Sequence, residues 1–441
     1  MDLKSARAFI EAHYLKNRTT VSADIPGILD GVEATTGLPV IRHRYPSGCD
    51  YATWIVPPQW DIREAWIKDA NGKVLASYED HPLFVAPYSM PIRKVVTKKE
   101  LLAHVFSSSN QPDAFAYNHR LAHNAKLRLK DWCVSLPQSL VESLDEGRFE
   151  VCIDASVSEG EMLVGEIVLQ GDEPDTIAFL ADWCHPGQVN DSFSGLVVFM
   201  EVMRSLAQRS RRRYTYKLLM FPETVGSSVY IGADPKKIHD VRGAIFSEMV
   251  GWGEEWFLKS TRRGGTYMDL LASECRRRFQ EVKYAPFFSH YGNDEYVFDS
   301  VQVGIPTLSL QKFPFAEYHT SNDHPSRLND ADLQQAYNII LHLVDVAERD
   351  AVYEFVHPVP FYMSRYDLYA DAIYEREAHD RNRNIQLRLN GQTSLLKIAD
   401  EIAVPFEVVF DYVERMASSN LVRKAKATPW KQPGAAQDTC R

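Results

Sequence analysis

The sequence has few cysteines, no basic excess and no long apolar run, and each of these features excludes a class of protein. Its formal net charge of −10 argues against a nucleic-acid binder that acts through a broad basic surface. No apolar run approaches the length of a membrane span. Residues 1–17 carry charges throughout and lack the apolar core of a signal peptide. We therefore expect a cytoplasmic protein with neither a membrane nor a nucleic acid as its partner.

The cysteines are too scattered to form a recognisable framework. None stands in C-x-x-C spacing, and the six are Cys49, Cys133, Cys152, Cys184, Cys275 and Cys440. This argues against a disulfide framework and against a zinc site built from thiolates. Cys184 precedes His185, but adjacent residues at a strand end point to opposite faces, which argues against a catalytic Cys-His pair. Any bound metal should therefore have His, Asp and Glu as its ligands.

The length of 441 residues predicts two or three domains. Residues 38–99 are dense in aromatic and β-branched residues, and "DANGK" within them predicts a hairpin. We expect a small all-β domain here, inserted into a larger α/β domain formed by residues 1–37 and 100–360. Residues 365–427 differ again and form the third expected domain.

Strands and helices alternate over residues 150–350, which predicts an α/β sheet covered on both faces. The expected strands include "DTIAFLAD", "YTYKLLMFPE", "VRGAIFSEMVG" and "GIPTLSLQK". In such a sheet the functional groups lie in the loops after the carboxyl ends of the strands.

Polar residues recur where these strands end. His185 and Asp191 follow one strand, Glu223 the next, Glu248 ends a third, and His319 lies beyond a fourth. Imidazole and carboxylate groups are zinc ligands, so the recurrence indicates a metal site. Taken singly, His319 could be a loop residue satisfied by Asp323, and Glu248 could cap a helix.

Residues 365–427 contain the pattern helix, short turn, helix and strand, as in a winged helix. A DNA contact through the second helix is disfavoured, because this helix carries three acidic residues, Glu407, Asp411 and Glu414, and only one basic residue, Arg415. We expect a packing or dimerisation module, so a homo-oligomer is one expectation. The basic run "RSRRRY" at 209–214 is expected to be a solvated helix end, with contact to an anion or a carrier protein as the alternative.

Five motifs, in order along residues 150–345, together resemble those of one enzyme family. They are "DSFSG" at 191–195, "FPETVG" at 221–226, "FSEMVG" at 246–251, "GNDEYVFDSVQVGIPTLSL" at 292–310 and "EYHTSND" at 317–323. The series resembles the co-catalytic zinc aminopeptidases of peptidase clan MH, which also holds glutamate carboxypeptidases and glutaminyl cyclases. The resemblance implies a three-layer α/β sandwich with a mixed sheet. The β insert and the winged helix resemble a bacterial aminopeptidase-like subgroup.

The resemblance also implies roles for single residues. His185 matches the first metal-binding histidine, and Asp191 matches the carboxylate that bridges two metals. Glu248 matches the acidic ligand of one metal, and His319 a ligand of the other. Glu223 then matches the general base that acts on a zinc-activated water.

Two departures from the family pattern predict fewer metals. Thr224 stands where the family has a second glutamate, which is a metal ligand. His185 is followed by Pro186 and Gly187, so the aspartate that orients this histidine in the family is missing. We therefore expect one zinc ion per chain, with two as the alternative. A further alternative makes Glu223 a ligand and places the base elsewhere.

Four residues are candidates for substrate binding. Asp294 and Glu295 are expected to hold an ammonium group of the substrate. His290 and Tyr291 are expected to donate to a developing oxyanion. The alternative is a turn that simply precedes a buried strand.

The expected function is zinc-dependent hydrolysis of an amide or peptide bond in a small amine-bearing substrate or short peptide of a biosynthetic pathway. Two alternatives remain at this point. One is amide chemistry similar to that of glutaminyl cyclases. The other is a non-catalytic protein that binds a ligand and acts through its winged helix.

Overall fold

The computed structural model describes residues 1–290 and 292–430. Its centre is an eight-stranded mixed sheet with the order β1-β10-β12-β11-β13-β16-β14-β15. The strands are β1 (Ile41–Pro46), β10 (Glu161–Leu169), β11 (Thr176–Trp183), β12 (Thr215–Pro222), β13 (Val241–Ser247), β14 (Glu255–Lys259), β15 (Val282–Ala285) and β16 (Thr307–Phe313). The adjacent strands β12, β11, β13 and β16 are parallel, so their carboxyl ends meet at one edge.

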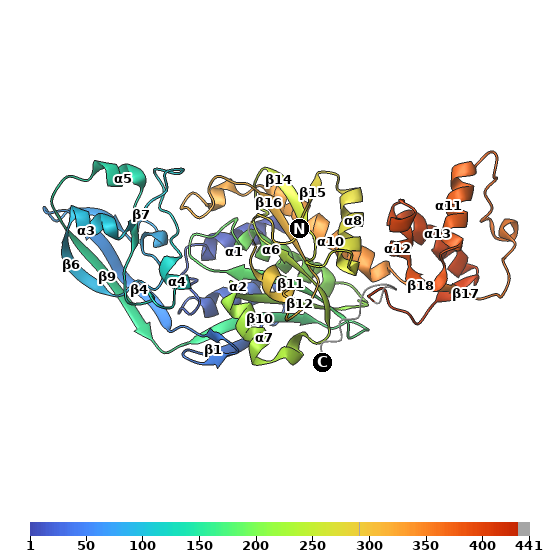
Figure 1. Cartoon of the computed structure of the whole chain (residues 1–441), viewed down its shortest axis with the longest axis horizontal. Helices are drawn as coiled ribbons and strands as arrows, with labels where there is room; N and C mark the ends of the chain where they lie inside the picture. Colours follow the sequence, from blue (N-terminus) through green and yellow to red (C-terminus); the bar gives the residue numbers. More distant parts are fainter. Residues whose placement is uncertain (291, 431–441) are drawn as a thin grey trace.

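Helices cover both faces of this sheet and make three layers (Figure 1). One face carries α1 (Leu3–His13), α2 (Ile25–Thr36), α6 (Phe193–Ala207), α8 (Tyr267–Arg278) and α10 (Asp330–Arg349). The other face carries α7 (Val225–Ala233) and α9 (Asp294–Phe298). Because both faces are covered, β11 is buried along its whole length, which explains its almost continuous apolar sequence. The expected α/β sandwich with a mixed sheet is confirmed.

A second sheet forms the core of an inserted region, residues 59–158, that we call the β module. Its order is β5-β4-β9-β6, and all its pairs are antiparallel. The strands are β4 (Gln59–Lys68), β5 (Val74–Ser77), β6 (Ile92–Thr97) and β9 (Arg148–Ser158). The hairpin predicted at "DANGK" joins β4 to β5, with the N–H of Asp69 donating to the carbonyl of Lys73 at 3.0 Å.

The limits of the β module differ from the expected 38–99. Strand β1 pairs with β10 and so belongs to the main sheet. Residues 98–147 belong to the module and include α3 (Lys98–Ala103), β7 (Val105–Phe106), α4 (Arg120–His123), β8 (Val134–Ser135) and α5 (Gln138–Ser143). Strand β9 then closes the module before β10 enters the main sheet. Strand patterning shows that a segment is extended but not which sheet it joins, so the sequence could not place these limits.

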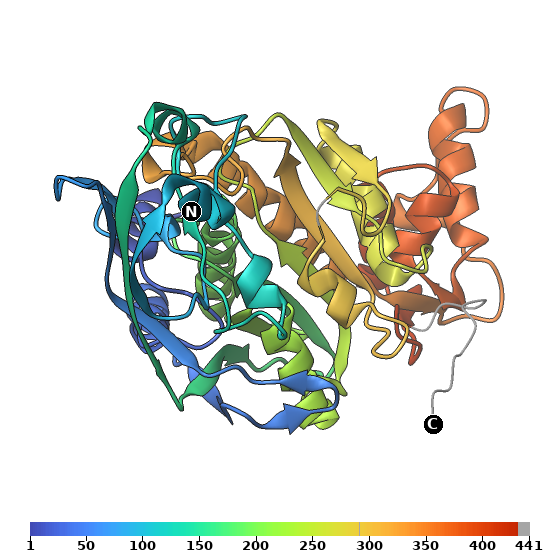
Figure 2. The ribbon, with the colours of Figure 1, turned by 60° about the vertical axis from the view of Figure 1, so that its left-hand side comes forward.

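The C-terminal module begins at β17 (Val352–Phe355), earlier than the expected residue 365, because this strand is the centre of its sheet. The sheet order is β18-β17-β19, with β18 (Asn390–Ser394) and β19 (Val422–Lys424). Its helices are α11 (Arg376–Gln386), α12 (Leu395–Glu401) and α13 (Phe406–Ser418). Figures 1 and 2 show this module and the β module at opposite ends of the molecule, with the main sheet between them.

Contacts of the C-terminal module with the main domain occupy acidic groups of α13. Glu407 forms a paired interaction with Arg349, at 2.7 and 2.5 Å. The backbone N–H of Phe406 donates to Oε1 of Glu274 at 3.0 Å. The module is thus packed against α8 and α10.

Among the helices that the structure describes, none combines the length and apolar character needed to cross a membrane.

The basic run at 209–214 is paired within the chain. Arg209 lies 2.6 Å from Asp345, Arg211 lies 2.5 Å from Asp172, and Arg213 lies 2.9 Å from Glu173. These pairs hold the turn after α6 against its neighbours. They leave less of the positive charge for an external anion or carrier protein than the sequence alone suggests.

Candidate metal centre

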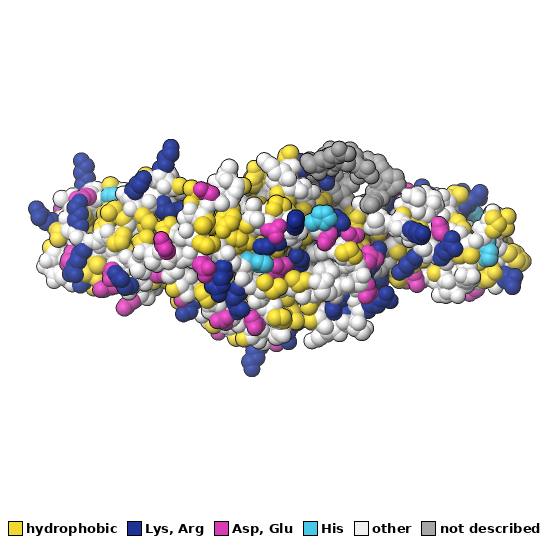
Figure 3. Space-filling view, turned by 90° about the horizontal axis from the view of Figure 1, so that it is seen from below, with side chains coloured by type: hydrophobic (Ala, Val, Ile, Leu, Met, Phe, Trp, Pro, Cys, Tyr) yellow, Lys and Arg dark blue, Asp and Glu magenta, His cyan; other side chains and the backbone are white. Residues whose placement is uncertain are grey.

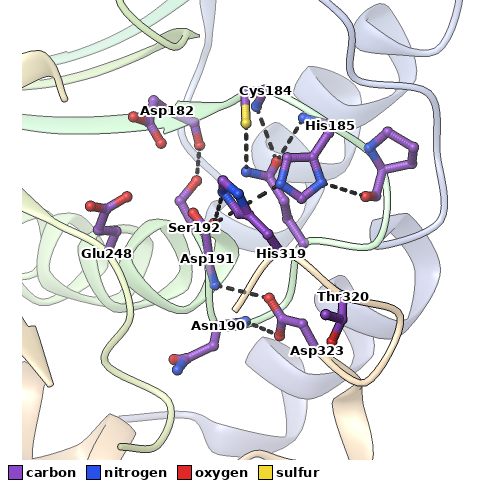
Figure 4. A network of polar contacts seen from close by, with 12 residues as sticks. Asp182, Cys184, His185, Asn190, Asp191, Ser192, Glu248, His319, Thr320 and Asp323 are labelled. Carbon is purple, nitrogen blue, oxygen red and sulfur yellow. Dashed lines mark hydrogen bonds and ion pairs between the residues drawn. The ribbon is translucent and has the colours of Figure 1, made fainter. Parts of the chain in front are cut away.

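Three of the predicted metal ligands lie together at the carboxyl edge of the parallel strands (Figure 4). His185 follows β11, Asp191 precedes α6, and His319 lies between β16 and α10. One possible ligand atom from each lies within 4.8 Å of the other two. Oδ2 of Asp191 is 4.0 Å from Nε2 of His185 and 3.2 Å from Nε2 of His319.

The orientation of His185 is set by the backbone. Its Nδ1 lies 2.7 Å from the carbonyl oxygen of Pro186, which can only accept a hydrogen bond. Nδ1 therefore carries the proton, and Nε2 presents its lone pair toward Asp191. Burial and the neighbouring imidazole of His319 lower the pKa of His185 well below 6.5, so the ring is neutral. The Pro186 carbonyl thus does for this ring what the missing aspartate does in the family pattern.

Asp191 is held in place by a second carboxylate, that of Asp323. The N–H of Asn190 donates to Oδ1 of Asp323 at 2.8 Å, and the N–H of Asp191 donates to its Oδ2 at 3.3 Å. Asp323 therefore fixes the loop that carries Asp191. It does not serve as the simple partner of His319 that one alternative supposed.

The three donor groups fit a zinc ion. Two ligand atoms on one zinc ion, each about 2.0–2.1 Å from it, are at most about 4.2 Å apart. The 3.2 Å separation suits a tetrahedral zinc ion and the 4.0 Å separation lies below this limit, while all three donor atoms lie within 4.8 Å of one another. Nε2 of His185 is also buried without a hydrogen-bond partner in the described part of the chain. Such an atom costs roughly 1–3 kcal/mol, a cost that coordination would remove.

Glu223 lies directly after β12, and its N–H donates to the carbonyl of Trp183 at 2.9 Å. This bond places it next to the end of β11. Although the side chain reaches solvent in part, burial and the carboxyl groups of Asp182 and Asp191 raise its pKa to about 8. A neighbouring cation would lower that pKa again and leave Glu223 ionised at neutral pH.

Several buried carboxyl groups surround Glu223 and repel one another. Burial raises the pKa of Asp182 to about 7, with Asp191 and Glu295 adding to the effect. Burial and Asp182 also raise the pKa values of Glu248 and Asp294. A site this rich in buried acid favours either bound protons or a bound cation.

Glu248 lies outside the group of three ligands, and Figure 4 shows it apart from the two imidazoles. Its oxygens accept from two amide groups, Gln311 at 2.7 Å and Asn293 at 2.9 Å. Glu248 is thus not among the residues whose donor atoms lie within 4.8 Å of one another, and its role as a metal ligand stays a prediction. At Thr224, the position of the missing family ligand, the backbone N–H donates to Asp294 at 3.1 Å.

The expected substrate-binding residues have partners within the chain, and their role toward a substrate stays a prediction. Asp294 is buried and accepts from the hydroxyl of Ser227. Glu295 is paired at 2.9 Å with Lys259, and both side chains are buried. His290 is exposed, with its ring against those of Phe257 and Phe313. Tyr291 lies outside the described residues.

Three residues of the site were not predicted from the sequence: Asp182, Arg18 and Tyr117. Asp182 could have been predicted, because an acidic residue within the apolar strand "TIAFLADW" is unusual. Arg18 is fully buried, donates to the carbonyls of Tyr14 and Gln188, and lies 3.9 Å above the ring of Phe193. Tyr117 comes from the β module. Neither Arg18 nor Tyr117 lies in a sequence pattern that predicts a place in this site.

Comparisons with known proteins bear on the family and the fold. A family described as "Domain of unknown function (DUF4910)" matches residues 7–350. A curated protein of Clostridium acetobutylicum, named provisionally as a polysaccharide biosynthesis protein with an aminopeptidase-like domain, is 26% identical over 323 residues, 73% of each chain. A crystal structure from Clostridium acetobutylicum, described provisionally as a peptidase, has a TM-score of 0.84 at 22% identity and 96% coverage of both chains.

A zinc aminopeptidase from Bacillus subtilis has a TM-score of 0.56 at 14% identity and covers 77% of this chain and 94% of its own. A peptidase M28 precursor from Shewanella amazonensis has a TM-score of 0.54 at 12% identity, covering 77% and 92%. At such identities these structures establish the fold alone. The fold is that of the zinc aminopeptidases, as the sequence motifs implied.

Proposed function

The chain belongs to the DUF4910 family, and we propose that it is a zinc-dependent hydrolase of an amide or peptide bond. One observation carries the proposal: the unpartnered Nε2 of His185 faces Asp191 and His319, while Glu223 ends the neighbouring strand. A ligand group and a candidate base therefore share one edge of the sheet. His185, Asp191 and His319 would hold the zinc ion.

The chemistry of the site divides between zinc and Glu223. A bound zinc ion would supply Lewis-acid activation of a water molecule and of the scissile carbonyl group. Glu223 accepts the proton of the attacking water and passes it to the leaving amine. It can do so only as a carboxylate, so its pKa of about 8 must fall when a cation is bound. At neutral pH a bound cation therefore favours the ionised form of Glu223, which is the form that acts as the base.

The substrate class follows from what surrounds the ligands. Asp294 and Glu295, the expected anchors of an ammonium group, are engaged by Ser227 and Lys259. We therefore do not restrict the proposed substrate to free amines, and consider an N-acyl group beside a peptide bond. The name of the clostridial relative, which includes polysaccharide biosynthesis, supports testing acylated amino sugars beside aminoacyl compounds.

The test is hydrolysis by the full chain after zinc reconstitution, with the zinc content verified. The panel contains aminoacyl amides, dipeptides and N-acylated amino sugars, and the same protein stripped of metal is the control. We expect turnover of at least one class that disappears with the metal and returns on adding zinc. If the verified zinc protein cleaves none of these classes, or if the stripped protein cleaves them equally well, the proposal is wrong.

A further inference from the structure

The β module reaches the candidate metal centre through one aromatic ring. The ring centroid of Tyr117 lies 3.8 Å from that of His185, with the planes 24° apart. The same ring meets His319 edge-on, at 5.1 Å and 89°. The two imidazoles are 5.2 Å apart and perpendicular to each other, at 89°. Tyr117 therefore fills the corner between them and is in contact with both.

The backbone of the same segment is joined to the segment that carries His319. The N–H of Tyr117 donates to the carbonyl of His319 at 2.7 Å. Ala116 and Thr320 form an antiparallel bridge, and the N–H of Ser321 donates to the carbonyl of Phe115 at 2.8 Å. Residues 115–117 and 319–321 thus pair as two short extended segments from different parts of the fold.

This pairing explains how His319 keeps its backbone conformation. Its φ is 59°, in the left-handed region that residues other than glycine rarely adopt. Such a conformation costs on the order of 1–3 kcal/mol and persists only where the surroundings fix it. The hydrogen bond from Tyr117 and the stacked ring of Tyr318, 3.8 Å away, supply those surroundings.

The hydroxyl of Tyr117 does not account for its position. The residue is 5% exposed, and its hydroxyl oxygen makes no hydrogen bond of regular geometry among the described residues, although it lies close to the thiol of Cys184. The ring, by contrast, contacts both imidazoles. The geometry therefore assigns the effect of Tyr117 on the site to its ring and its backbone.

We propose that residues 115–117 of the β module are part of the metal centre, with Tyr117 as the residue that positions His185 and His319. The inference rests on the proposed function in taking both histidines as zinc ligands. It adds that the ligand geometry depends on a region outside the main domain. Any displacement of the β module would then change the affinity for zinc.

The test compares zinc affinities of full-length variants by competition with a chelator. Tyr117→Ala removes the ring, and loss of a group that orients metal ligands typically lowers affinity by about 10–100-fold. Tyr117→Phe keeps the ring and should bind zinc within about twofold of the parent chain. Cobalt-substituted protein gives a second readout: its visible absorption bands should shift in Tyr117→Ala and stay unchanged in Tyr117→Phe.

Tyr88→Ala is the matched control for general loss of stability. Tyr88 is also buried in the β module, at 1% exposed against 5% for Tyr117, and its ring packs against Trp60 at 6.0 Å and against Arg128 at 4.9 Å. This variant should melt earlier and bind zinc normally. The proposal is overturned if Tyr88→Ala and Tyr117→Ala weaken zinc binding alike, if Tyr117→Ala binds as tightly as the parent, or if Tyr117→Phe is as weak as Tyr117→Ala.

These outcomes separate the inference from the proposed function. Zinc affinity is measured without turnover, so a chain that needs Tyr117 for zinc but hydrolyses nothing contradicts the hydrolase alone. A parent chain that binds no zinc contradicts both.

Discussion

Nδ1 of His185 donates a hydrogen bond to the carbonyl oxygen of Pro186 at 2.7 Å, so Nε2 of the same ring is directed toward Asp191. The contact is local and depends on the turn that follows β11. A backbone carbonyl thereby orients the ring without the second-shell carboxylate that the family pattern implies. The ligand geometry should consequently be sensitive to the conformation of this turn.

Gly187 is the residue through which that sensitivity can be tested. Its φ is +74°, its N–H donates to the carbonyl of Tyr14 at 2.6 Å, and an added Cβ would lie 2.8 Å from the ring of His81. We expect Gly187→Ala to lower the free energy of unfolding by more than the roughly 1–2 kcal/mol that a left-handed backbone alone costs. We also expect it to weaken zinc binding. Thermal melting and chelator competition measure the two effects.

Gly72→Ala provides the control, because Gly72 has a φ of +83° with nothing within 4 Å of an added Cβ. Gly72→Ala should lose only the stability that the left-handed backbone costs, and it should bind zinc as the parent chain does. Equal zinc affinities in the two variants would mean that the turn does not orient His185.

Glu223→Gln keeps the size and hydrogen-bonding capacity of the side chain and removes the base. A positioned base contributes about 10²–10⁴-fold, so turnover should fall by at least about a hundredfold while zinc is retained. Kinetics and metal content are measured on the same sample. Loss of zinc would instead make Glu223 a ligand, and unchanged turnover with zinc present would refute the mechanism.

Stability of the metal-free protein should depend on the ionisation of Glu223. Its pKa is raised from 4.5 to about 8 in the folded state, so the folded chain holds a proton that the unfolded chain has released between those values. The free energy of unfolding that this group contributes is therefore fully present below about pH 4.5 and is lost as pH rises toward 8.

The comparison with metal-free Glu223→Gln isolates this group from other titrating residues. The melting temperature of the parent, relative to the variant, should fall between pH 6 and pH 8, and zinc should reduce the fall by favouring the ionised carboxylate. A difference that is constant or grows with pH would show that Glu223 is already ionised without metal.

The C-terminal module should not bind DNA. Glu407 of α13 pairs with Arg349 of α10, and Glu414 accepts from the hydroxyl of Tyr353 at 2.6 Å within the module, so two acidic groups of this helix already have partners in the chain. The face drawn in Figure 3 mixes basic and acidic side chains without a broad basic area. We predict no sub-micromolar gel shift of duplex DNA by the full chain. A salt-sensitive shift that requires residues 365–427 would contradict this.

The sequence predicted the sheet and the meeting of His185, Asp191 and His319 at one edge, because both depend on order along the chain. Parallel strands place their ends at one edge, so residues after β11, β12 and β16 had to meet there. The orientation of Asp294 could not be predicted in this way. Its burial against Ser227 depends on how α7 and α9 pack, and a polar "GND" motif gives no sign of it.

The place of Tyr117 beside His185 could not be predicted from the sequence, for a similar reason. It lies in a stretch that forms neither helix nor named strand, and its relation to His185 exists only after the β module has docked. Asp182 is the opposite case. An acid near the end of an otherwise apolar strand is a visible anomaly, and the structure shows it within the carboxyl cluster.

The most direct test of the account is the zinc content of the purified full-length protein, determined by elemental analysis. Among the residues that the structure describes, one group of candidate ligands is found, formed by His185, Asp191 and His319, and Thr224 stands where the resembling family has a further ligand. We predict close to one tightly bound zinc per chain and its loss in His185→Ala. Two tightly bound equivalents, or none after supplementation with zinc, would contradict the central claim.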